Sequence, residues 1–464
     1  MTILKVNPYI FREYDIRGVV KEDFTKDLII NLGKALGTYY NHLGVREITL
    51  GRDCRLSSPS LHDWLLTGLL SSGMNVIDIG LCHTPLLYFS LFHLSSGGGV
   101  MITGSHNPPD NNGFKICLGK STIHGTEIQA LRKIMEDESF VSGTGSVMEM
   151  DLKEIYKEEV FSRLKSGERS VKVVIDAGNG TGGLFAPDIY RKMGMEVIEL
   201  YCNPDGNFPN HHPDPTVEDY MKDLSERVMK EGADLGIAFD GDADRIGVIS
   251  DRGKIIWGDQ LMILFSREIL KDHPGACFIS EVKCSQTLFD DIEHHGGRAI
   301  MWKVGHSLIK KKLAEERALL AGEMSGHIFF AHRYFGFDDA VYSGGRVLEI
   351  LSETGKSLSE LLSDIPATVN TPEIRFPCSD EIKFEIVKKV VDYFKEKHKV
   401  VDIDGARVIF PEGWALVRAS NTQPVIVMRF EATTGEELAK IRRTVEEILE
   451  KMIKIRFDEK GLTK

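Results

Sequence analysis

Up to about residue 366, the hydrophobic and polar positions of the chain follow two alternating patterns. Short runs rich in β-branched and apolar residues are separated by longer stretches whose apolar residues recur with helical spacing. The runs that predict strands are 46–50, 75–79, 99–102, 171–175, 196–201, 234–239 and 276–280. The stretches that predict helices are 26–43, 58–72, 151–167, 258–271, 286–296 and 306–317. Strands that alternate with helices in this way indicate an α/β architecture.

The pattern changes after Ile365-Pro366. The elements predicted there are a helix over 380–397, clustered strands over 407–410, 414–418 and 425–431, and a long final helix from residue 435. Clustered strands indicate an α+β terminal domain. At roughly 100–200 residues per domain, a chain of 464 residues predicts three or four domains. The changes in pattern place their boundaries near residues 152, 254 and 368, so the predicted domains are 1–152, 153–254, 255–368 and 369–464.

Composition excludes several classes of protein. A formal net charge of −12 disfavours nucleic acid as a partner. The N-terminus lacks the basic and apolar regions of a signal peptide, and no run reaches the roughly 18 apolar residues of a membrane span. The seven cysteines include no C-x-x-C pair, so we expect a reduced, cytoplasmic protein without a zinc site or a membrane partner. A phosphorylated small substrate stays compatible with the charge if cations gather locally in a cleft.

The first candidate site is the sequence TGSHNP at 103–108, directly after a predicted strand. A serine on a tight turn at a strand end is exposed enough to act as a nucleophile, although these residue types also form plain turns. The sequence is not the G-x-S-x-G elbow of the α/β-hydrolases. Lys115 lies ten residues after Ser105 and can return to the same turn as a cation.

The second candidate site is DGDADR at 240–245, between the apolar runs 234–239 and 246–250. Carboxylates at alternate positions of an extended loop can converge, and three such charges repel unless a cation binds them. The loop is not an EF-hand, since its sixth position is Arg245 and its twelfth is Asp251. Ligation by carboxylates alone favours Mg²⁺ over the other common metals.

Two further stretches carry polar groups suited to a phosphorylated sugar. In GEMSGH at 322–327, Glu323 and Ser325 can face sugar hydroxyls while His327 lies further along the same side. His306, at a predicted helix start after Gly305, is either a proton carrier or a surface residue. RASNTQP at 418–424 combines an arginine, hydroxyls and turn amides, which together can hold an anion.

Two alternatives come from other classes of enzyme. The glycines of 178–183 satisfy G-x-G-x-x-G, and Glu199 follows at the spacing of a dinucleotide site, which favours an NAD-dependent oxidoreductase. The strand that leads into Asp240 also resembles the start of a haloacid-dehalogenase-type phosphatase, although Asp244 stands where that family usually has Thr or Val. The pairs His211-His212 and His294-His295 have no ligand-like companions and are predicted to lie on the surface.

Taken in order, the motifs resemble the α-D-phosphohexomutase superfamily, in its phosphomannomutase/phosphoglucomutase branch. The matching stretches span nearly the whole chain and are REYDIRG (12–18), TGSHNP (103–108), DGDADR (240–245), GEMSGH (322–327) and RASNTQP (418–424). Phosphoglucosamine mutase is the alternative within the superfamily, but those enzymes more often carry Gln after the Glu and Ala before the serine. The resemblance implies three related α/β domains with mixed sheets plus a smaller α+β C-terminal domain, arranged around a central cleft.

The resemblance also implies an activity, which is the reversible conversion of hexose 1-phosphate to hexose 6-phosphate through a phosphoserine and a 1,6-bisphosphate intermediate. Ser105 would carry the phosphoryl group, and an oxygen of that phosphate would complete a Mg²⁺ site made by Asp240, Asp242 and Asp244. The residues implied around the reacting groups are Arg17, Lys115, Arg245, His306 and His327. Those implied for substrate binding are Tyr14, Lys283, Gly305, Glu323, Ser325, Arg418, Ser420, Asn421 and Thr422.

The expected partners are phosphorylated hexoses, with glucose 1,6-bisphosphate or mannose 1,6-bisphosphate as an activator. A preference between mannose and glucose does not follow from the motifs, because both sugars share hydroxyls that Glu323 and Ser325 could bind. A monomer is expected by default, since nothing in the sequence marks an interface.

Overall fold

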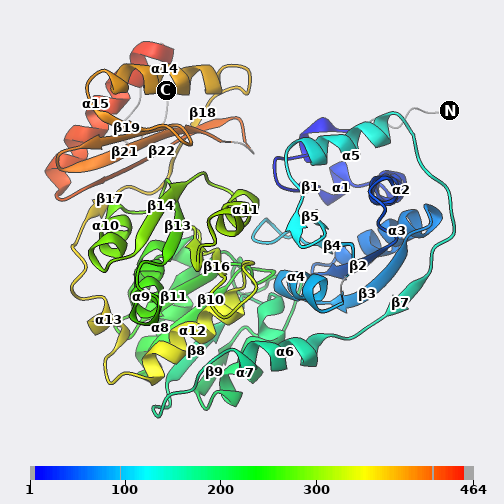
Figure 1. The fold of residues 1–464 in the computed structure, drawn as a ribbon, viewed down its shortest axis with the longest axis horizontal. Helices are drawn as coiled ribbons and strands as arrows, with labels where there is room; N and C mark the ends of the chain where they lie inside the picture. Colours follow the sequence, from blue (N-terminus) through cyan, green and yellow to red (C-terminus); the bar gives the residue numbers. More distant parts are fainter. Residues whose placement is uncertain (1–5, 95, 421–422, 454–464) are drawn as a thin grey trace.

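The computed structural model describes residues 6–94, 96–420 and 423–453. Its strands form four separate sheets that follow one another along the chain (Figure 1). Figure 1 shows the N-terminal sheet and the C-terminal domain on opposite sides of the molecule, joined by the second and third sheets. Among the described residues, no helix is long and apolar enough to cross a membrane.

The first sheet is mixed, because a parallel set of strands is extended by the antiparallel strands β5 and β1. In spatial order its strands are β1 (Ile16–Val19), β5 (Asn111–Leu118), β4 (Gly98–Ile102), β2 (Glu47–Arg52), β3 (Asn75–Leu81) and β7 (Val147–Glu149), with β6 (Ser121–Thr122) paired to β5. Its helices are η1 (Pro8–Ile10), α1 (Val20–Asp23), α2 (Lys26–His42), α3 (Ser58–Ser71), α4 (Thr84–His93) and α5 (Thr126–Glu136). The reversal between β4 and β5 leaves a turn at one end of the sheet, and Ser105 lies on that turn.

The second sheet is also mixed, and its strands in order are β12 (Ile255–Ile256), β11 (Ile246–Ser250), β10 (Leu235–Phe239), β8 (Lys172–Asp176) and β9 (Glu196–Leu200). The helices that accompany it are α6 (Lys153–Ser162), η2 (Thr181–Leu184), α7 (Ala186–Lys192), η3 (Glu218–Met221) and α8 (Lys222–Glu231). The predicted domain boundary at residue 254 falls just before β12, which pairs with this sheet.

The third sheet has the strand order β14 (Arg298–Trp302), β13 (Cys277–Glu281), β15 (Leu320–Gly322) and β16 (Ile328–Phe330). Its helices are α9 (Gly258–Asp272), α10 (Gln286–His294), α11 (His306–Glu316), α12 (Ala340–Ser352) and α13 (Leu358–Leu361). An isolated bridge between Arg245 and His327 connects the second sheet to the third. The connection brings the DGDADR loop beside the GEMSGH loop.

The C-terminal sheet is antiparallel throughout, as the clustered strands of the sequence predict. Its strands in order are β17 (Val369–Asn370), β22 (Val425–Ala432), β21 (Gly413–Ala419), β20 (Ala406–Phe410) and β19 (Lys399–Val401), with β18 (Ile374–Pro377) also paired to β22. The helices α14 (Lys383–Lys395) and α15 (Gly435–Ile453) contribute apolar residues to a core that this domain keeps to itself. The α/β fold with mixed sheets and a smaller α+β end domain is therefore confirmed.

One large hydrophobic cluster joins the first three domains, although the first domain also has a separate core of its own. A single cluster of buried apolar side chains extends from Ile77 on β3 through α4 and β10 to Leu358 on α13. The C-terminal domain contacts this unit through a much smaller apolar cluster of Val282, Trp414 and Leu416. The groups that meet at the Asp240 loop are thus attached to one packed unit, whereas the C-terminal domain is attached by fewer contacts.

Arg407 is the principal polar connection of the C-terminal domain to the third domain. Its side chain is fully buried, and Nη1 donates hydrogen bonds to the carbonyls of Val282 (2.5 Å) and Cys284 (2.8 Å). The guanidinium also lies 3.8 Å from the ring centroid of Trp414. Burial lowers the pKa of Arg407 to about 10, which leaves it charged at neutral pH.

We expect Arg407→Met to loosen the C-terminal domain. The substitution leaves buried carbonyls without donors, and each such group costs about 1–3 kcal/mol. Thermolysin should therefore cleave the connecting segment 366–373 at least about 10-fold faster than in the wild type, because cleavage follows the population of the opened form. Lys389→Met, which removes an exposed ion pair to Glu385 on α14, serves as the control and should be cleaved at the wild-type rate. Equal cleavage of both variants would show that Arg407 does not secure this interface.

Candidate active site

Ser105 lies on the turn after β4 in a backbone conformation that is uncommon for serine. Its φ angle is 47°, and its amide donates a hydrogen bond to the Thr103 hydroxyl (2.8 Å). The Ser105 hydroxyl donates to Asp240 Oδ2 at 2.6 Å and lies 3.1 Å from His106 Nδ1. The turn therefore joins two motifs that are 135 positions apart in the sequence. A left-handed conformation outside glycine persists only where the surroundings hold it, and such positions concentrate at functional sites.

Arg55, which no motif of the sequence indicated, binds the carbonyls of this turn. The side chain is 1% exposed, and Nη2 donates to the carbonyls of Ser105 (2.7 Å) and Asn107 (2.6 Å). Nη1 donates to the carbonyls of Pro108 (2.6 Å) and Asn111 (2.9 Å). A planar guanidinium can serve several carbonyls at once, whereas a lysine amine cannot reproduce that geometry. A single buried arginine leaves no periodic signal, so only its position near a predicted strand end could have drawn attention to it.

The acidic loop between β10 and β11 brings its carboxylates together, as predicted. Asp240, Asp242 and Asp244 are each fully buried, and one oxygen from each lies within 4.8 Å of the others. Asp240 Oδ1 accepts the backbone N–H groups of Asp244 and Arg245, both at 3.1 Å. Asp242 Oδ1 and Asp244 Oδ1 have no hydrogen-bond partner among the described residues. Buried carboxylate oxygens that converge without donors provide the ligands that a divalent cation needs.

Lys115 compensates part of this negative charge. Its Nζ lies 2.6 Å from Asp242 Oδ2 and also pairs with Asp244. Burial alone would lower the pKa of Lys115, but Asp242, Asp244 and Asp240 outweigh it and raise the pKa above its ordinary value. For Asp242, burial acts to raise the pKa, but the neighbouring Lys115 ammonium more than offsets this and lowers it. Burial together with Asp242 and Asp244 raises the pKa of Asp240 well above its usual range, so one positive charge is too little for three carboxylates.

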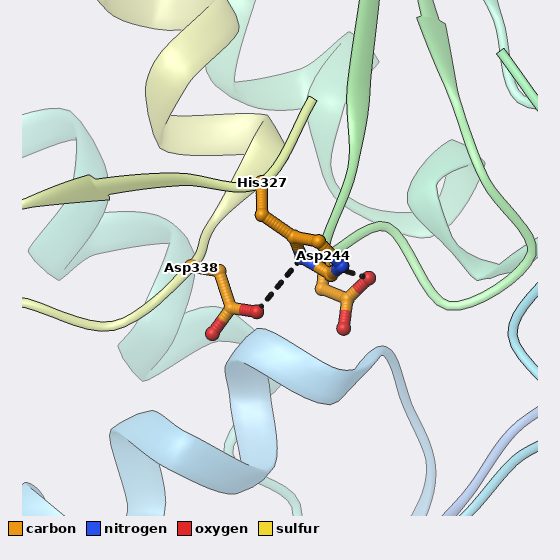
Figure 2. Close-up of side chains that lie close together, drawn as sticks. All are labelled: Asp244, His327 and Asp338. Atoms are coloured by element: carbon orange, nitrogen blue, oxygen red, sulfur yellow. Dashed lines mark ion pairs between the residues drawn. The ribbon is translucent and has the colours of Figure 1, made fainter. Parts of the chain in front are cut away.

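His327 lies close to both Asp244 and Asp338 (Figure 2). Its Nε2 accepts a hydrogen bond from Arg245 Nε at 3.0 Å, so the proton of the neutral ring resides on Nδ1. That Nδ1 lies 2.9 Å from Asp338 Oδ2 and 3.6 Å from Asp244 Oδ1. His327 and Asp338 are buried, and Lys310 Nζ lies 3.2 Å from the other Asp338 oxygen. Asp338 is a further residue that the motifs did not indicate.

The three side chains of Figure 2 could also hold a metal ion by distance alone. A metal at His327 Nδ1 would move the ring proton to Nε2, where Arg245 already donates. The arrangement therefore favours a fixed orientation of the imidazole over a metal site. The ring of His306 stacks on that of His327 with centroids 5.5 Å apart, and burial lowers the pKa of His306 well below its usual value.

The GEMSGH loop meets the N-terminal motif REYDIRG around Gly305. Glu323 Oε1 accepts the Gly305 N–H at 2.7 Å, and Glu323 Oε2 accepts the Ser325 hydroxyl at 3.1 Å. The φ angle of Gly305 is 131°, and a Cβ there would come within 2.5 Å of the Tyr14 ring, so only glycine suits this position. The Tyr14 hydroxyl donates to the Val304 carbonyl at 2.9 Å.

Arg17, from the same N-terminal motif, forms an ion pair with Asp15 at 2.6 Å. Burial acts to lower the pKa of Arg17, but Asp15, followed by Asp242 and Asp244, outweighs it and raises the pKa. The N-terminal motif and the acidic loop thus contribute to one charged region.

A second group of predicted substrate-binding residues lies where the third domain meets the C-terminal domain. Arg418 Nε lies 3.1 Å from Asp404 Oδ2, and the same oxygen accepts the Val304 N–H at 3.0 Å. Lys283 Nζ lies 2.9 Å from Glu373, and although burial lowers its pKa, the carboxylates around it outweigh burial and raise the pKa. Ser420 is buried directly after β21, and its carbonyl accepts a hydrogen bond from Lys383 Nζ at 2.5 Å, whereas Asn421 and Thr422 lie outside the described residues. The carboxylates Asp404 and Glu373 were not predicted.

Comparison with known proteins settles the family. Four profiles of the phosphoglucomutase/phosphomannomutase family match the chain in order, namely α/β/α domains I (residues 8–142), II (152–253) and III (257–369) and the C-terminal domain (373–448). The chain belongs to the phosphoglucomutase/phosphomannomutase family. It is 47% identical to a phosphomannomutase/phosphoglucomutase of Pseudomonas aeruginosa over 434 residues, which cover 93% of this chain and 94% of the relative.

Other members of the family agree with this assignment. The chain is 44% identical over 448 residues to a phosphoglucomutase of Neisseria gonorrhoeae, with 95% of this chain and 96% of the relative covered. A solved structure of a phosphoglucomutase/phosphomannomutase family protein from Burkholderia thailandensis superposes with a TM-score of 0.90 at 40% identity, covering 97% of this chain and 98% of that one. The resemblance inferred from the motifs is therefore confirmed, and the oxidoreductase and phosphatase alternatives are not favoured.

We expect Arg55→Lys to loosen the Ser105 turn. Lysine can satisfy only some of the carbonyls that Arg55 binds, and each buried carbonyl left without a donor costs about 1–3 kcal/mol. The free energy of unfolding in urea should fall by about 2–4 kcal/mol. Hydrogen exchange should accelerate at the Asn107 and Asn111 amides, which donate to carbonyls within the turn in the wild type. Arg132→Lys alters a partly exposed ion pair on α5 and is the control, for which neither quantity should change. Unchanged exchange in Arg55→Lys would contradict the role given to Arg55.

Proposed function

We propose that this protein interconverts hexose 1-phosphate and hexose 6-phosphate, with mannose, glucose or both as the sugar, through a phosphorylated Ser105. The observation that carries the proposal is the 2.6 Å contact between the Ser105 hydroxyl and Asp240, inside a buried cluster of carboxylates. Family membership makes a phosphoryl-transferring mutase the activity that this geometry serves. Serine is chemically suited to carry the phosphoryl group, because its Oγ can both accept that group and leave from it.

The first half of the reaction moves the phosphoryl group from Ser105 to the sugar. The bond between phosphorus and Ser105 Oγ breaks while a bond forms between phosphorus and O6 of a hexose 1-phosphate. The O6 proton is lost and Ser105 Oγ regains one, so charge and atoms balance. Such transfer depends on positioning and on neutralising the phosphoryl charge. After the 1,6-bisphosphate has turned over in the cleft, the second half runs in the opposite direction at O1. The bond between phosphorus and O1 breaks while a bond forms between phosphorus and Ser105 Oγ, which loses its proton as O1 gains one.

Lys115, Arg17 and Arg245 supply positive charge at the reacting end. Because its raised pKa keeps Lys115 protonated, it can act as a cation there. Lys115 is also the first candidate for the group that returns a proton to Ser105 Oγ. His306 and His327 are the remaining candidates for proton transfer, and the neutral state favoured for His306 is the one that accepts a proton. A group that acts as an acid toward Ser105 Oγ in the first half of the reaction acts as a base toward it in the second half.

The substrate would be held at its other end by residues of the third and fourth domains. Glu323 and Ser325 would bind sugar hydroxyls, with Tyr14 and Gly305 shaping the adjoining wall. Arg418, Ser420 and Lys283, together with Asn421 and Thr422, would hold the phosphate that is not transferred. Because Arg418 and Lys283 are paired with carboxylates here, the incoming phosphate would replace Asp404 or Glu373 as their partner. This exchange of partners limits the cost of keeping cations buried in the free enzyme.

Asp240, Asp242 and Asp244 would bind Mg²⁺, completed by an oxygen of the Ser105 phosphate. The donor set fits, because the three buried carboxylates converge and, among the described residues, Asp242 Oδ1 and Asp244 Oδ1 have no hydrogen-bond partner. A bound Mg²⁺ would stabilise the negative charge on the transferring phosphoryl group. Glucose 1,6-bisphosphate or mannose 1,6-bisphosphate would act as activator by rephosphorylating Ser105 when the bisphosphate escapes. The monomeric state, the cytoplasmic location and the lack of nucleic-acid and membrane partners stay predictions from composition.

We expect Ser105→Ala to abolish turnover. Turnover can be followed by ³¹P NMR after mixing the protein with mannose 1-phosphate or glucose 1-phosphate, Mg²⁺ and a trace of glucose 1,6-bisphosphate. The wild type should form the 6-phosphates without free phosphate. The relative rates rank the two sugars. Loss of the group that forms the covalent intermediate should lower the rate at least about 10³-fold. Ser139→Ala, at an exposed serine, should behave as the wild type. Free phosphate in place of the 6-phosphates would replace the proposal by a phosphatase.

The metal assignment can be tested independently of activity. Asp242 belongs only to the Asp240 triad and Asp338 only to the group of Figure 2, so a substitution at each separates the two possible sites. In Mn²⁺ titrations followed by electron paramagnetic resonance, Asp242→Asn should weaken binding by more than about 10-fold because it removes a charged ligand. Asp338→Asn should leave the affinity within about 2-fold. The opposite ranking would place the ion at Asp244, His327 and Asp338.

A further inference from the structure

Two sequence features that have no part in the proposed function lie against the Ser105 turn and the acidic loop. These are the glycine-rich stretch 178–183 and the pair His211-His212. The structure contradicts the prediction that His211 and His212 lie on the surface, because both are half-buried in the segment that follows β9. The second pair, His294-His295, is exposed on and just after α10, as predicted.

His212 contacts the Ser105 turn through a single hydrogen bond. Its Nε2 donates to the carbonyl of His106, the residue directly after Ser105. The edges of Phe208 and Tyr220 fix the plane of the His212 ring, with centroids 6.5 Å and 5.6 Å away. The Ser105 carbonyl is held by Arg55 from the first domain, so consecutive carbonyls of the turn are held from different domains.

The backbone of His212 is fixed in turn by an imidazolium. His211 Nε2 lies 2.9 Å from Asp176 Oδ2, and His211 Nδ1 lies 3.0 Å from the His212 carbonyl. Both partners are acceptors, so both ring nitrogens of His211 carry protons. Asp176 is buried at the end of β8, where its other oxygen accepts the Gly178 N–H at 2.8 Å. The whole connection therefore begins at a central strand of the second sheet.

The same glycine-rich stretch also holds the acidic loop. Thr181 donates from its amide (3.0 Å) and from its hydroxyl (3.1 Å) to the carbonyl of Gly241. A Cβ on Gly241 would lie 2.5 Å from the Ser105 carbonyl oxygen, so the two loops are in direct backbone contact. The fingerprint that resembled a dinucleotide site is thus occupied by the protein's own loops.

From this geometry we propose that His212 is a positioning residue for the phosphorylated serine, an inference that rests on the proposed function. By holding the His106 carbonyl, it keeps Ser105 in the left-handed conformation in which its hydroxyl faces Asp240. Without that bond, the turn can relax, because a non-glycine residue leaves the left-handed region readily. A small displacement of the reacting oxygen from the carboxylate cluster then lowers the rate of phosphoryl transfer, while the distant sugar-binding groups stay in place.

Three substitutions at His212 test this inference. His212→Ala and His212→Phe remove the donor, and the second keeps a ring between Phe208 and Tyr220. His212→Gln retains a side-chain amide that can donate from a similar position. We expect Ala and Phe to lower kcat about 10- to 100-fold with KM within about 2-fold of the wild type, and Gln to recover at least a third of the wild-type kcat. His294→Ala, from the exposed pair, is the matched control and should leave kcat unchanged.

Hydrogen exchange separates this inference from the proposed function. The Ser105 and Asn107 amides, bonded to Thr103 Oγ1 and to the Gly104 carbonyl, should exchange faster in His212→Ala and His212→Phe than in the wild type and in His212→Gln. This result does not require turnover, so a wild-type protein without mutase activity would overturn the proposed function alone. The role of His212 would be overturned if His212→Phe kept the wild-type exchange rates and kcat. It would also be overturned if His212→Gln lost as much kcat as His212→Ala.

Discussion

Three carboxylates buried at the end of one strand pair are the constraint on which the rest of the structure depends. Asp240, Asp242 and Asp244 repel one another in a setting without water to screen them, so their burial is stable only where positive charge is brought to them. Lys115 comes from the first sheet for this purpose, and Arg245 follows directly in the sequence. The hydrophobic cluster shared by the first three domains serves the same requirement, because it fixes the distances between the carboxylates and these positive charges.

Much of the fold could be predicted from the sequence because amphipathic elements record which face they bury. Helix α9 and the strands β20 to β22 lie within about a residue of their predicted bounds. Helices α4, α5, α7, α8 and α12 were not predicted, although α5 and α8 bury only one face. Nearly every residue of α4 is buried, so its sequence offers little periodicity to detect. In α12 the polar residues recur every three positions, but the interior pair Gly344-Gly345 lowers helix propensity.

The residues of the candidate site likewise fall into those that the sequence could predict and those that it could not. Residues in local motifs, such as Ser105 and the three aspartates, could be predicted because their spacing itself suggests chemistry. Arg55, Asp338 and His212 act on those residues from distant parts of the chain, and their contacts exist only after the sheets have packed. The pairs His211-His212 and His294-His295 show this most directly, because identical dipeptides lie in a half-buried connection in one case and at an exposed helix end in the other.

The uneven division of the hydrophobic core has a mechanical consequence. Opening the first three domains relative to one another would expose apolar surface, whereas the fourth domain keeps its own core through any rigid rotation. Arg407 and Trp414 hold that domain to the segment around Val282, and the neighbouring contacts at Val304 and Lys283 are polar ones that water or a phosphate can replace. A swing of the fourth domain about this small contact therefore costs less free energy than opening the first three domains. Such a swing would admit a charged sugar and give a bisphosphate the room to invert, while the carboxylate cluster stays fixed.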